Sequence, residues 1–186
     1  MNKSRGFTLV ELLYTIAIAG LLMAVGVPTF TTTMQNGAMT ASTNSIVTAL
    51  LAGRSEAVKR RLRVTVCPAE LVSGNPACTA DGTNLLVFTN TADDATFNSA
   101  AGDTVVQFQQ WVRGKVTTAS TNLPGYVSYL PSGYTRLVGG GPIAGDLVFC
   151  DARGDSFARV MSISATGRPQ VRKRADVPAA PACPTS

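Results

Sequence analysis

The stretch "RGFTLVELL", from Arg5 to Leu13, decides the fold, because it opens a long apolar run and places a single carboxylate inside that run. Glu11 is the only charged residue from Phe7 to Val27. A helix of this length spans roughly 30 Å, which is the thickness of the apolar core of a bilayer. Since a charge inside such a segment is costly, Glu11 is a candidate functional residue.

The charges that flank the apolar run predict its orientation. Lys3 and Arg5 precede the run, and the next basic residue is Arg54. The positive-inside rule therefore places the first residues in the cytoplasm and the chain after Val27 on the other side of the membrane. A secretory signal peptide would be cut after the run, near "AVGVPTF" (24–30), whereas cleavage after Gly6 would keep the helix in the mature protein.

The first residues resemble the type IV prepilin signature. In that family a prepilin peptidase cuts after the glycine, methylates the new amino-terminal phenylalanine and leaves a glutamate four residues further on, and Gly6, Phe7 and Glu11 match these positions. The resemblance implies a leader at 1–6, a transmembrane helix at 7–27, and an assembly contact between Glu11 and the amine of a neighbouring subunit. The alternative for Glu11 is an acid that snorkels to the membrane surface without a partner.

A continuation of the same helix is expected over 28–62. Apolar residues return there at helical spacing, at Val47, Leu50, Leu51, Val58 and Leu62. Pro28 falls where prepilin-like proteins often carry a helix-bending proline, and it removes one backbone donor. Because the polar run that follows is a weak helix former and contains Gly37, we expect the helix to be unwound or kinked between Pro28 and Gly37.

The remaining residues, 63–186, form one predicted β-rich domain. Turn-forming clusters separate short β-type runs, and the expected strands are 63–67, 85–90, 104–112, 125–131, 134–138, 146–150 and 156–164. Strands of this length and spacing favour antiparallel sheets packed on the exposed half of the helix, so the predicted fold class is α+β. The Gly-rich "VGGGPIAGD" (138–146) lacks the spacing of a phosphate-binding loop and is expected to be a hairpin loop.

Four cysteines, Cys67, Cys78, Cys150 and Cys183, form an even set without CxxC spacing. Behind a membrane-targeting segment they predict two disulfides in an oxidising compartment, although the sequence alone permits three pairings. We favour Cys67 with Cys78, because a turn-rich loop separates them, and Cys150 with Cys183, which would fasten a Pro-rich tail. Four buried free thiols are the alternative.

The composition argues against an enzyme. No histidine occurs among the 186 residues, which excludes His-dependent nucleophile pairs and HExxH zinc sites. The acids are dispersed, and "DARGD" (151–155) lacks the spacing and the closing glutamate of an EF-hand loop. We therefore expect no catalytic residue, no metal and no cofactor.

Two further stretches narrow the resemblance. "ALLAGRSEAVKRRLRVTVC" (49–67) and "LVFCDARGDSFARVMSISATGR" (147–168) resemble the junction after the helix and the closing strands of the FimT/FimU/GspH group of minor pilins and minor pseudopilins. The resemblance implies a pilin-like fold, anchored in the inner membrane with its globular domain in the periplasm. It also implies a structural subunit that primes or caps a type IV pilus or a type II secretion pseudopilus, with other pilins or pseudopilins and prepilin peptidase as partners.

The net charge of +5 is concentrated in two basic clusters. The first lies at 54–63, where cations would stabilise the carboxyl end of the helix. The second is "GRPQVRKR" (167–174), which matches the first half of the Gly-Arg-x-Arg turn through which some FimT-like competence pilins bind DNA, although Gln170 replaces the second arginine. The alternative function is therefore weak, sequence-independent DNA binding during DNA uptake, by Gly167, Arg168, Arg172, Lys173 and Arg174. A solvated edge that meets neighbouring pilins is the competing interpretation.

Overall fold

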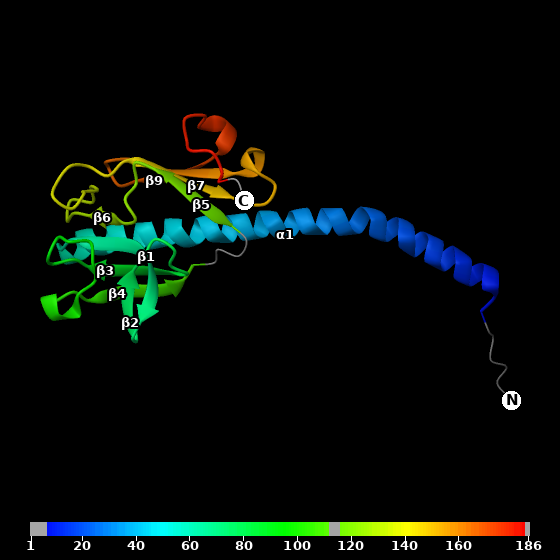
Figure 1. Ribbon diagram of the computed structural model, residues 1–186, viewed down its shortest axis with the longest axis horizontal. Coiled ribbons are helices and arrows are strands. Elements are labelled where there is room, and N and C mark those ends of the chain that lie inside the picture. Colours follow the sequence, from blue (N-terminus) through cyan, green and yellow to red (C-terminus); the bar gives the residue numbers. More distant parts are fainter. Residues whose placement is uncertain (1–6, 112–115, 185–186) are drawn as a thin grey trace. The chain divides into compact units, whose positions relative to one another are not determined.

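The computed structural model describes residues 7–111 and 116–184, and the chain forms two compact units, Met1–Gly37 and Ala38–Ser186. One helix, α1 (Leu9–Arg60), contributes to both units (Figure 1). The predicted cleavage site at Gly6 lies outside the described residues, whereas Phe7 lies within them.

The described part of the first unit is the amino-terminal part of α1, and its apolar surface is uncovered. Every residue from Phe7 to Met34 is exposed, including Leu9, Ile16 and Leu21. By length and composition this part of the helix can cross a membrane, with a mean hydropathy of 2.1 over its most apolar window. A continuous apolar surface of this size needs a cover, and a bilayer supplies one.

The expectation that the helix unwinds between Pro28 and Gly37 is wrong. Helical structure continues without interruption through both residues. The proline removes only one backbone hydrogen bond from the helix. Threonine hydroxyls can form hydrogen bonds with backbone groups in non-helical conformations, but here they donate to carbonyl oxygens of the helix itself. Thr29 donates to the carbonyl oxygen of Val25 at 3.0 Å, and Thr32 donates to that of Pro28 at 3.0 Å. A bend of the helix at Pro28 stays a prediction.

The second unit contains two antiparallel sheets. The first has the strand order β2-β1-β3-β4, with β6 paired to the opening residues of β1, and the second has the order β5-β7-β8-β9. The strands are β1 (Val64–Val72), β2 (Asn75–Cys78), β3 (Asn84–Thr89), β4 (Val105–Gln110), β5 (Thr117–Thr121), β6 (Val127–Tyr129), β7 (Gly145–Cys150), β8 (Arg159–Ile163) and β9 (Pro169–Lys173). The predicted α+β fold, a long helix packed on antiparallel sheets, is confirmed.

Three strands were not predicted, and one predicted strand is absent. The missed strands β2, β5 and β9 each lie at the edge of a sheet. Edge strands tolerate proline and polar residues because one side of their backbone meets solvent, so they lack the apolar alternation of a buried strand. The expected strand 134–138 instead makes one isolated bridge, between Thr135 and Tyr129.

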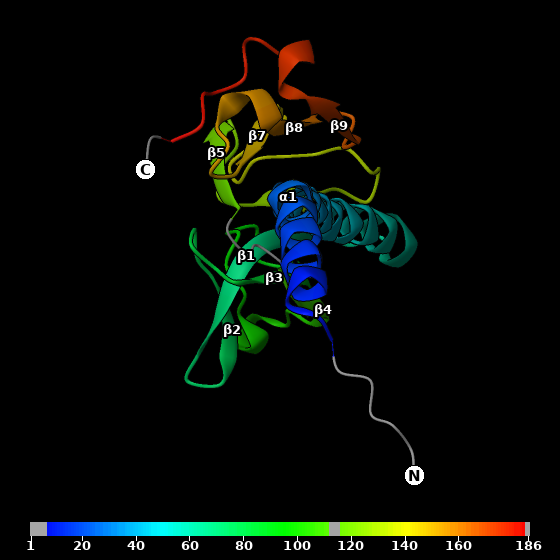
Figure 2. The ribbon, with the colours of Figure 1, turned by 90° about the vertical axis from the view of Figure 1, so that its right-hand side faces the viewer.

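The two sheets lie on opposite sides of the carboxyl-terminal part of α1 (Figure 2). This part of the helix buries one face, with Met39, Ile46, Leu50 and Ala57 at helical spacing, against apolar residues of both sheets. A glycine permits the closest approach: a Cβ at Gly53 would lie 2.6 Å from Cγ2 of Val66 on β1. The helix ends at Arg60, and the next residue, Arg61, adopts a left-handed conformation with φ 56°.

Both disulfides join the pairs that we favour from the sequence. Cys67 and Cys78 connect β1 to β2 within one hairpin. Cys150, at the end of β7, is joined to Cys183 in the tail. The tail covers the face of the second sheet that is turned away from the helix, where Val148, Val160 and Ala180 form a separate apolar cluster.

Candidate functional site

The carboxylate of Glu11 takes part in a reciprocal cap at the start of α1. The backbone N–H of Glu11 donates to Oγ1 of Thr8 at 3.2 Å, and the backbone N–H of Thr8 donates to Oε2 of Glu11 at 3.5 Å. This is a capping box, which satisfies donors that the first turn of a helix leaves unpaired. The pattern "TLVE" (8–11) is the sequence signal of this capping box, which was not among the predicted features.

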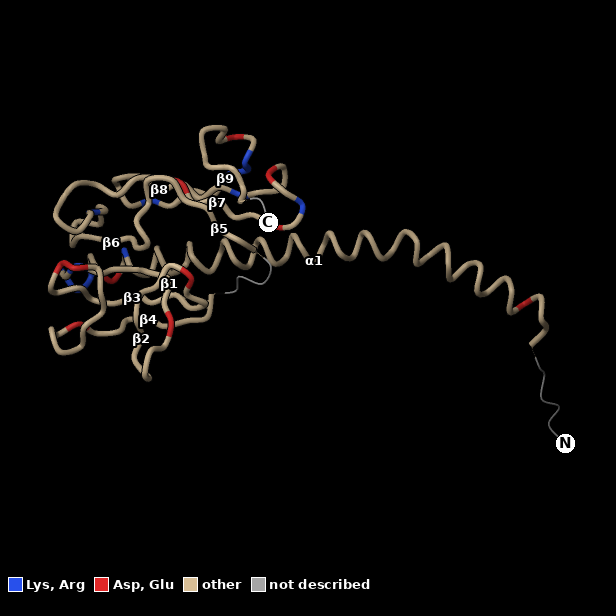
Figure 3. The backbone as a smooth tube through the Cα atoms, in the orientation of Figure 1, with Lys and Arg blue, Asp and Glu red and all other residues tan. Residues whose placement is uncertain are grey.

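Apart from this cap, the first unit offers an apolar surface with one charge. In residues 7–37 Glu11 is the only charged side chain, and the tube drawing shows a single acidic segment there (Figure 3). The first turn of a helix is partially positive, so the carboxylate is placed where the helix stabilises it. The arrangement combines a membrane-spanning surface with one fixed negative charge near its beginning.

Among the described residues, three of the basic side chains at the end of α1 pair with acids, and Arg54 and Arg61 form no ion pair. Glu56 accepts from Arg60 at 2.5 Å and lies 3.5 Å from Nζ of Lys59. The hydrogen bond from Arg60 holds the pKa of Glu56 below its ordinary value. Arg63 pairs with Asp93 in the loop after β3. This cluster therefore serves mainly the helix end and its connection to the first sheet.

The second basic cluster forms an edge strand and the turn before it. Gly167 is buried and has a φ of +76°, and its N–H donates to the carbonyl oxygen of Ser164 at 2.8 Å. Arg168 follows this turn with an exposed side chain, and β9 begins at Pro169. The glycine of the "GR" pair thus has a structural reason to be there, because only glycine adopts this conformation without strain.

The strand conformation divides the cations of β9 between the two faces of the sheet. Successive side chains of a strand point to opposite faces. Arg172 lies opposite Val160, which belongs to the cluster under the tail, whereas Lys173 lies opposite Arg159 on the other face. The run "RKR" in the sequence is therefore not one continuous basic patch.

Arg174 is removed from the set of candidate DNA-binding residues. Its guanidinium donates to the carbonyl oxygens of Val177 at 2.5 Å and Ala180 at 2.9 Å, and it lies 3.2 Å from the carboxylate of Asp155. Only 14% of its side chain is exposed. The residue holds the tail against the second sheet, and no sequence pattern indicates these carbonyl partners.

The fold and the amino-terminal segment each match a known protein family. The family model described as type II transport protein GspH matches residues 42–167. The chain belongs to the GspH family. A second model, the prokaryotic N-terminal methylation motif, matches residues 1–27. The GspH match covers most of the second unit, and the methylation motif covers the segment that holds Gly6, Phe7 and Glu11.

Solved structures support the same fold for this GspH-family chain. The chain is similar to two crystal structures of the type IV minor pilin FimU from Pseudomonas aeruginosa (strain PAO1). The structure in space group P21 has a TM-score of 0.58 and 19% identity, with 79% of this chain and 95% of that chain covered. The structure in space group P65 has a TM-score of 0.55 and 18% identity, with 76% of this chain and 96% of that chain covered. The comparison with curated proteins gave no match.

The family indicates the kind of function to expect from the described residues. The family is one of structural pilin and pseudopilin subunits, which are generally not enzymes. In residues 7–111 and 116–184 no group of three or more Cys, Asp or Glu side chains is placed to hold a metal ion. The features that remain for function are the exposed apolar helix with Glu11, and the surfaces of the second unit.

Proposed function

We propose that this protein is a minor pilin or minor pseudopilin that primes or caps a type IV pilus or a type II secretion pseudopilus. Prepilin peptidase removes residues 1–6 and methylates Phe7, and residues 7–27 cross the inner membrane. Residues 28–62 continue the helix, and residues 63–186 form the periplasmic globular domain. Its partners are other pilins or pseudopilins.

One observation carries this proposal: the exposed apolar helix takes no part in the protein's own core. The buried residues of the described chain begin at Met39, so the second unit forms its core without residues 7–37. The helix surface from Phe7 to Met34 is therefore available first to lipid and then to the helices of neighbouring subunits. This is the chemistry that a subunit needs when it leaves a membrane and enters a filament.

Glu11 has two separable roles in this proposal. Its hydrogen bond caps its own helix, whereas its charge attracts the amine at the amino terminus of a neighbouring subunit. Glu11→Gln keeps an acceptor for the cap and removes the charge. Thr8→Ala removes the hydroxyl of the cap and keeps the charge.

The test compares these two variants for incorporation into filaments, measured by immunoblotting of sheared or purified filaments against the membrane fraction. We expect Glu11→Gln to remain in the membrane with little protein in filaments. We expect Thr8→Ala to be incorporated nearly as well as wild type. Normal incorporation of Glu11→Gln, or an equal loss in both variants, would show that the charge is not the assembly contact.

The second candidate function is sequence-independent contact with DNA. It is supported by the exposed side chains of Arg168, Arg172 and Lys173. With Arg174 held by the tail, three cations remain, and Arg172 and Lys173 point to opposite faces of the sheet. Three phosphate contacts are therefore the upper limit, and the slope of log affinity against log salt is no steeper than about −2.7. Retention of DNA by Arg168→Ala/Arg172→Ala is compared with retention by Lys59→Ala/Arg60→Ala, which removes the same charge elsewhere. A selective loss in the first variant supports DNA contact, and equal retention rejects it.

A further inference from the structure

The second sheet ends at β9 with an open backbone edge (Figure 2). Strand β8 pairs with one side of β9, and no described strand pairs with the other side. Four of the five residues of β9 are exposed. The opposite edge of the sheet is β5, which follows residues 112–115 outside the described chain. An open, exposed edge is a template on which a further strand can pair.

The register of β9 shows which of its backbone groups point outward. Arg172 lies opposite Val160, and the N–H of Arg174 donates to the carbonyl oxygen of Ala158 at 3.1 Å. In an antiparallel pair, residues that exchange hydrogen bonds alternate with residues that do not. Arg172 therefore bonds to β8, whereas the N–H and C=O groups of Val171 and Lys173 point away from β8. Within the described chain these outward groups have no hydrogen-bond partner.

The side chains at this edge are positive on both faces of the sheet. Successive side chains of a strand alternate between the faces, so Arg172 points to the face under the tail and Lys173 to the face that packs on α1. Arg168 is exposed just before the strand, and β9 itself contains no acid. In the described chain Asp155 is paired in the salt bridge that holds the tail, and Asp176 lies beyond the end of β9. The edge therefore attracts a negatively charged partner.

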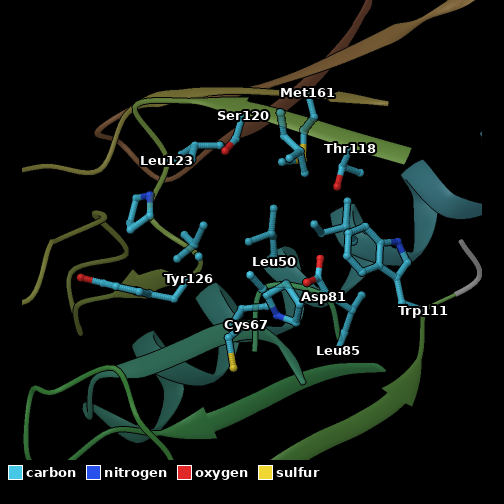
Figure 4. A pocket seen from close by; sticks show the side chains of 18 of the residues that line it. Leu50, Cys67, Asp81, Leu85, Trp111, Thr118, Ser120, Leu123, Tyr126 and Met161 are labelled. Atoms are coloured by element: carbon cyan, nitrogen blue, oxygen red, sulfur yellow. The ribbon is translucent and has the colours of Figure 1, made fainter. Parts of the chain in front are cut away.

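Val171 supplies an apolar contact between these cations. It lies opposite Met161, which lines the cleft of about 640 Å³ between the two sheets and α1 (Figure 4). Met161 is buried, whereas Val171 is 40% exposed. The apolar layer on this face of the sheet is therefore incomplete at β9, and an apolar side chain on an added strand would cover Val171.

A peptide strand matches the hydrogen-bonding groups of this edge better than a nucleic acid does. The edge presents donors and acceptors in alternation, at the N–H and C=O groups of Val171 and Lys173. The phosphate groups of DNA supply acceptors and no donors, so they would leave the two carbonyl oxygens without a partner. A peptide backbone supplies both, and its side chains alternate between the two faces as those of Arg172 and Lys173 do.

We propose that the open edge of β9 binds an extended acidic segment of a partner protein, which adds to the four-stranded second sheet as a further strand. Acidic side chains of this segment lie beside Arg172 and Lys173, and an apolar side chain lies beside Val171. Backbone hydrogen bonds to Val171 and Lys173 provide affinity, and the order of acidic and apolar side chains provides specificity. Such docking does not depend on the filament role, because the edge contains no residue of α1.

The test uses the full chain in a non-ionic detergent and a fluorescein-labelled peptide of sequence Glu-Glu-Val-Thr-Val-Glu. Its order places the two acids, the first valine and the last acid opposite residues 173, 172, 171 and 168 of an antiparallel partner. One control peptide carries lysines in place of the glutamates. A second control is N-methylated at both valines, so it keeps every charge and loses the backbone donors that face β9.

Fluorescence anisotropy measures the affinity of each peptide. We expect the acidic peptide to bind saturably and at least about tenfold more tightly than either control. Equal affinity of the N-methylated peptide would show that charge alone attracts the peptide. That result, or no saturable binding of the acidic peptide, would overturn the proposal.

Two variants of Val171 locate the binding. Val171→Pro removes an outward N–H and keeps every cation, and proline is tolerated on an edge strand where the N–H faces solvent. Val171→Ala keeps the N–H and shortens the same side chain, so it is the matched control. We expect Val171→Pro to weaken the acidic peptide by at least about tenfold and Val171→Ala by no more than about threefold. The N-methylated peptide tests the same hydrogen bonds in the wild-type protein, so the result does not depend on how Val171→Pro folds.

Binding of duplex DNA to the same variants separates strand addition from charge-driven contact. If Val171→Pro binds both the acidic peptide and the duplex as tightly as wild type does, the edge serves charge-driven contact such as that with DNA, and strand addition is rejected. Arg172→Glu/Lys173→Glu reverses the charge on both faces, and we expect it to prefer the lysine peptide. A preference for the acidic peptide that persists in this variant would place the binding elsewhere and would contradict the assignment to β9.

Discussion

Gly167 and Gly133 meet so closely that a Cβ on Gly167 would lie 2.5 Å from the carbonyl oxygen of Gly133. The same Cβ would lie 2.8 Å from Cε1 of Tyr129, which is fully buried. Both glycines have positive φ, +76° and +80°. The turn before β9 therefore packs directly, backbone against backbone, on the turn that follows β6.

This contact predicts a large effect of Gly167→Ala on stability. The substitution strains the backbone by about 1–2 kcal/mol and adds a steric clash that costs typically another 1–3 kcal/mol. Gly102→Ala is the matched control, because Gly102 has a left-handed conformation with a φ of +91° and no atom within 4 Å of an added Cβ. We expect chemical denaturation to show a smaller loss for Gly102→Ala. Equal losses in the two variants would mean that the close approach contributes nothing.

The two disulfides should differ in what they contribute. The Cys150–Cys183 bond joins residues 33 apart in sequence, and the Cys67–Cys78 bond joins residues 11 apart. In the chain-entropy account the longer loop contributes about 4 kcal/mol and the shorter about 3 kcal/mol. Replacement of each pair by serines, followed by denaturant unfolding, measures the two losses. A larger loss for the Cys67–Cys78 pair would show that contacts in the hairpin, rather than loop length, decide the order.

Substitution by alanine should affect stability strongly at Arg174 and hardly at all at Arg172. Arg174→Ala leaves the carbonyl oxygens of Val177 and Ala180 without their donor and should lower the free energy of unfolding by about 2 kcal/mol. Arg172 is exposed, and Arg172→Ala should change it by less than about 0.5 kcal/mol. Thermal unfolding of both variants measures the difference. Equal stabilities would contradict the role of Arg174 in fastening the tail.

Stability should fall at acidic pH partly because of Asp151. The side chain of Arg153 donates to this carboxylate at 3.1 Å and 2.5 Å, and this hydrogen bonding holds the pKa of Asp151 below its ordinary value. A group with a lower pKa in the folded state stabilises the protein above its unfolded pKa, about 4, and that contribution is lost as the pH falls through the folded pKa. Asp151→Asn should therefore be less stable than wild type at pH 7, and the gap should narrow as the pH falls below about 4. A stability difference between Asp151→Asn and wild type that does not change with pH would show that the shape of the side chain, and not its charge, causes the effect.

Processing of the amino terminus gives a direct prediction. Co-expression with prepilin peptidase should produce an intact mass that lacks residues Met1–Gly6 and carries one added methyl group at Phe7. Replacement of Gly6 by a bulky residue should block the cut, because glycine presents an unhindered backbone to the peptidase. Mass spectrometry of the purified protein measures both. An amino terminus beyond Val27 would identify a cleaved signal peptide instead.

The sequence predicted the fold where apolar periodicity is strong. The central strands β3 and β7 lie where the apolar patterns placed them. The face of α1 was predicted less well, because Leu50 is buried but Leu51, Val58 and Leu62 are exposed. Small residues such as Ala49, Gly53 and Ala57 form much of the buried face, and a search for large apolar residues does not find them.

The edge strands β2, β5 and β9 were missed because the backbone of an edge strand pairs on one side only and needs little apolar surface. The segment 134–138 contains residue types that favour strands, but it makes only an isolated bridge to Tyr129. The hydroxyl of Thr135 instead donates to the carbonyl oxygens of Ile143 and Ala165.

The candidate sites were predicted with uneven success. Some depend on consecutive residues, whereas others depend on residues that are far apart in the sequence. Gly6, Phe7 and Glu11 form a local pattern that can be read from a few consecutive residues. The role of Arg174 depends on carbonyl groups in a tail whose path is set by a disulfide, and the open edge of β9 depends on its pairing with β8. No local pattern contains such long-range information, so these features emerged only from the three-dimensional structure.

The hydroxyl groups near Pro28 affect how deeply the anchor can sit in the bilayer. Thr29, Thr32 and Thr33 each donate to a carbonyl oxygen of their own helix, so these donors lose no hydrogen bond when water is withdrawn. The segment is polar in composition, and yet the free-energy cost of removing water from these threonine hydroxyls is low. The limit of the lipid-compatible surface is therefore gradual at this end of the helix. In the proposed pilin role, this would let the subunit change its depth along the membrane normal as it leaves the bilayer.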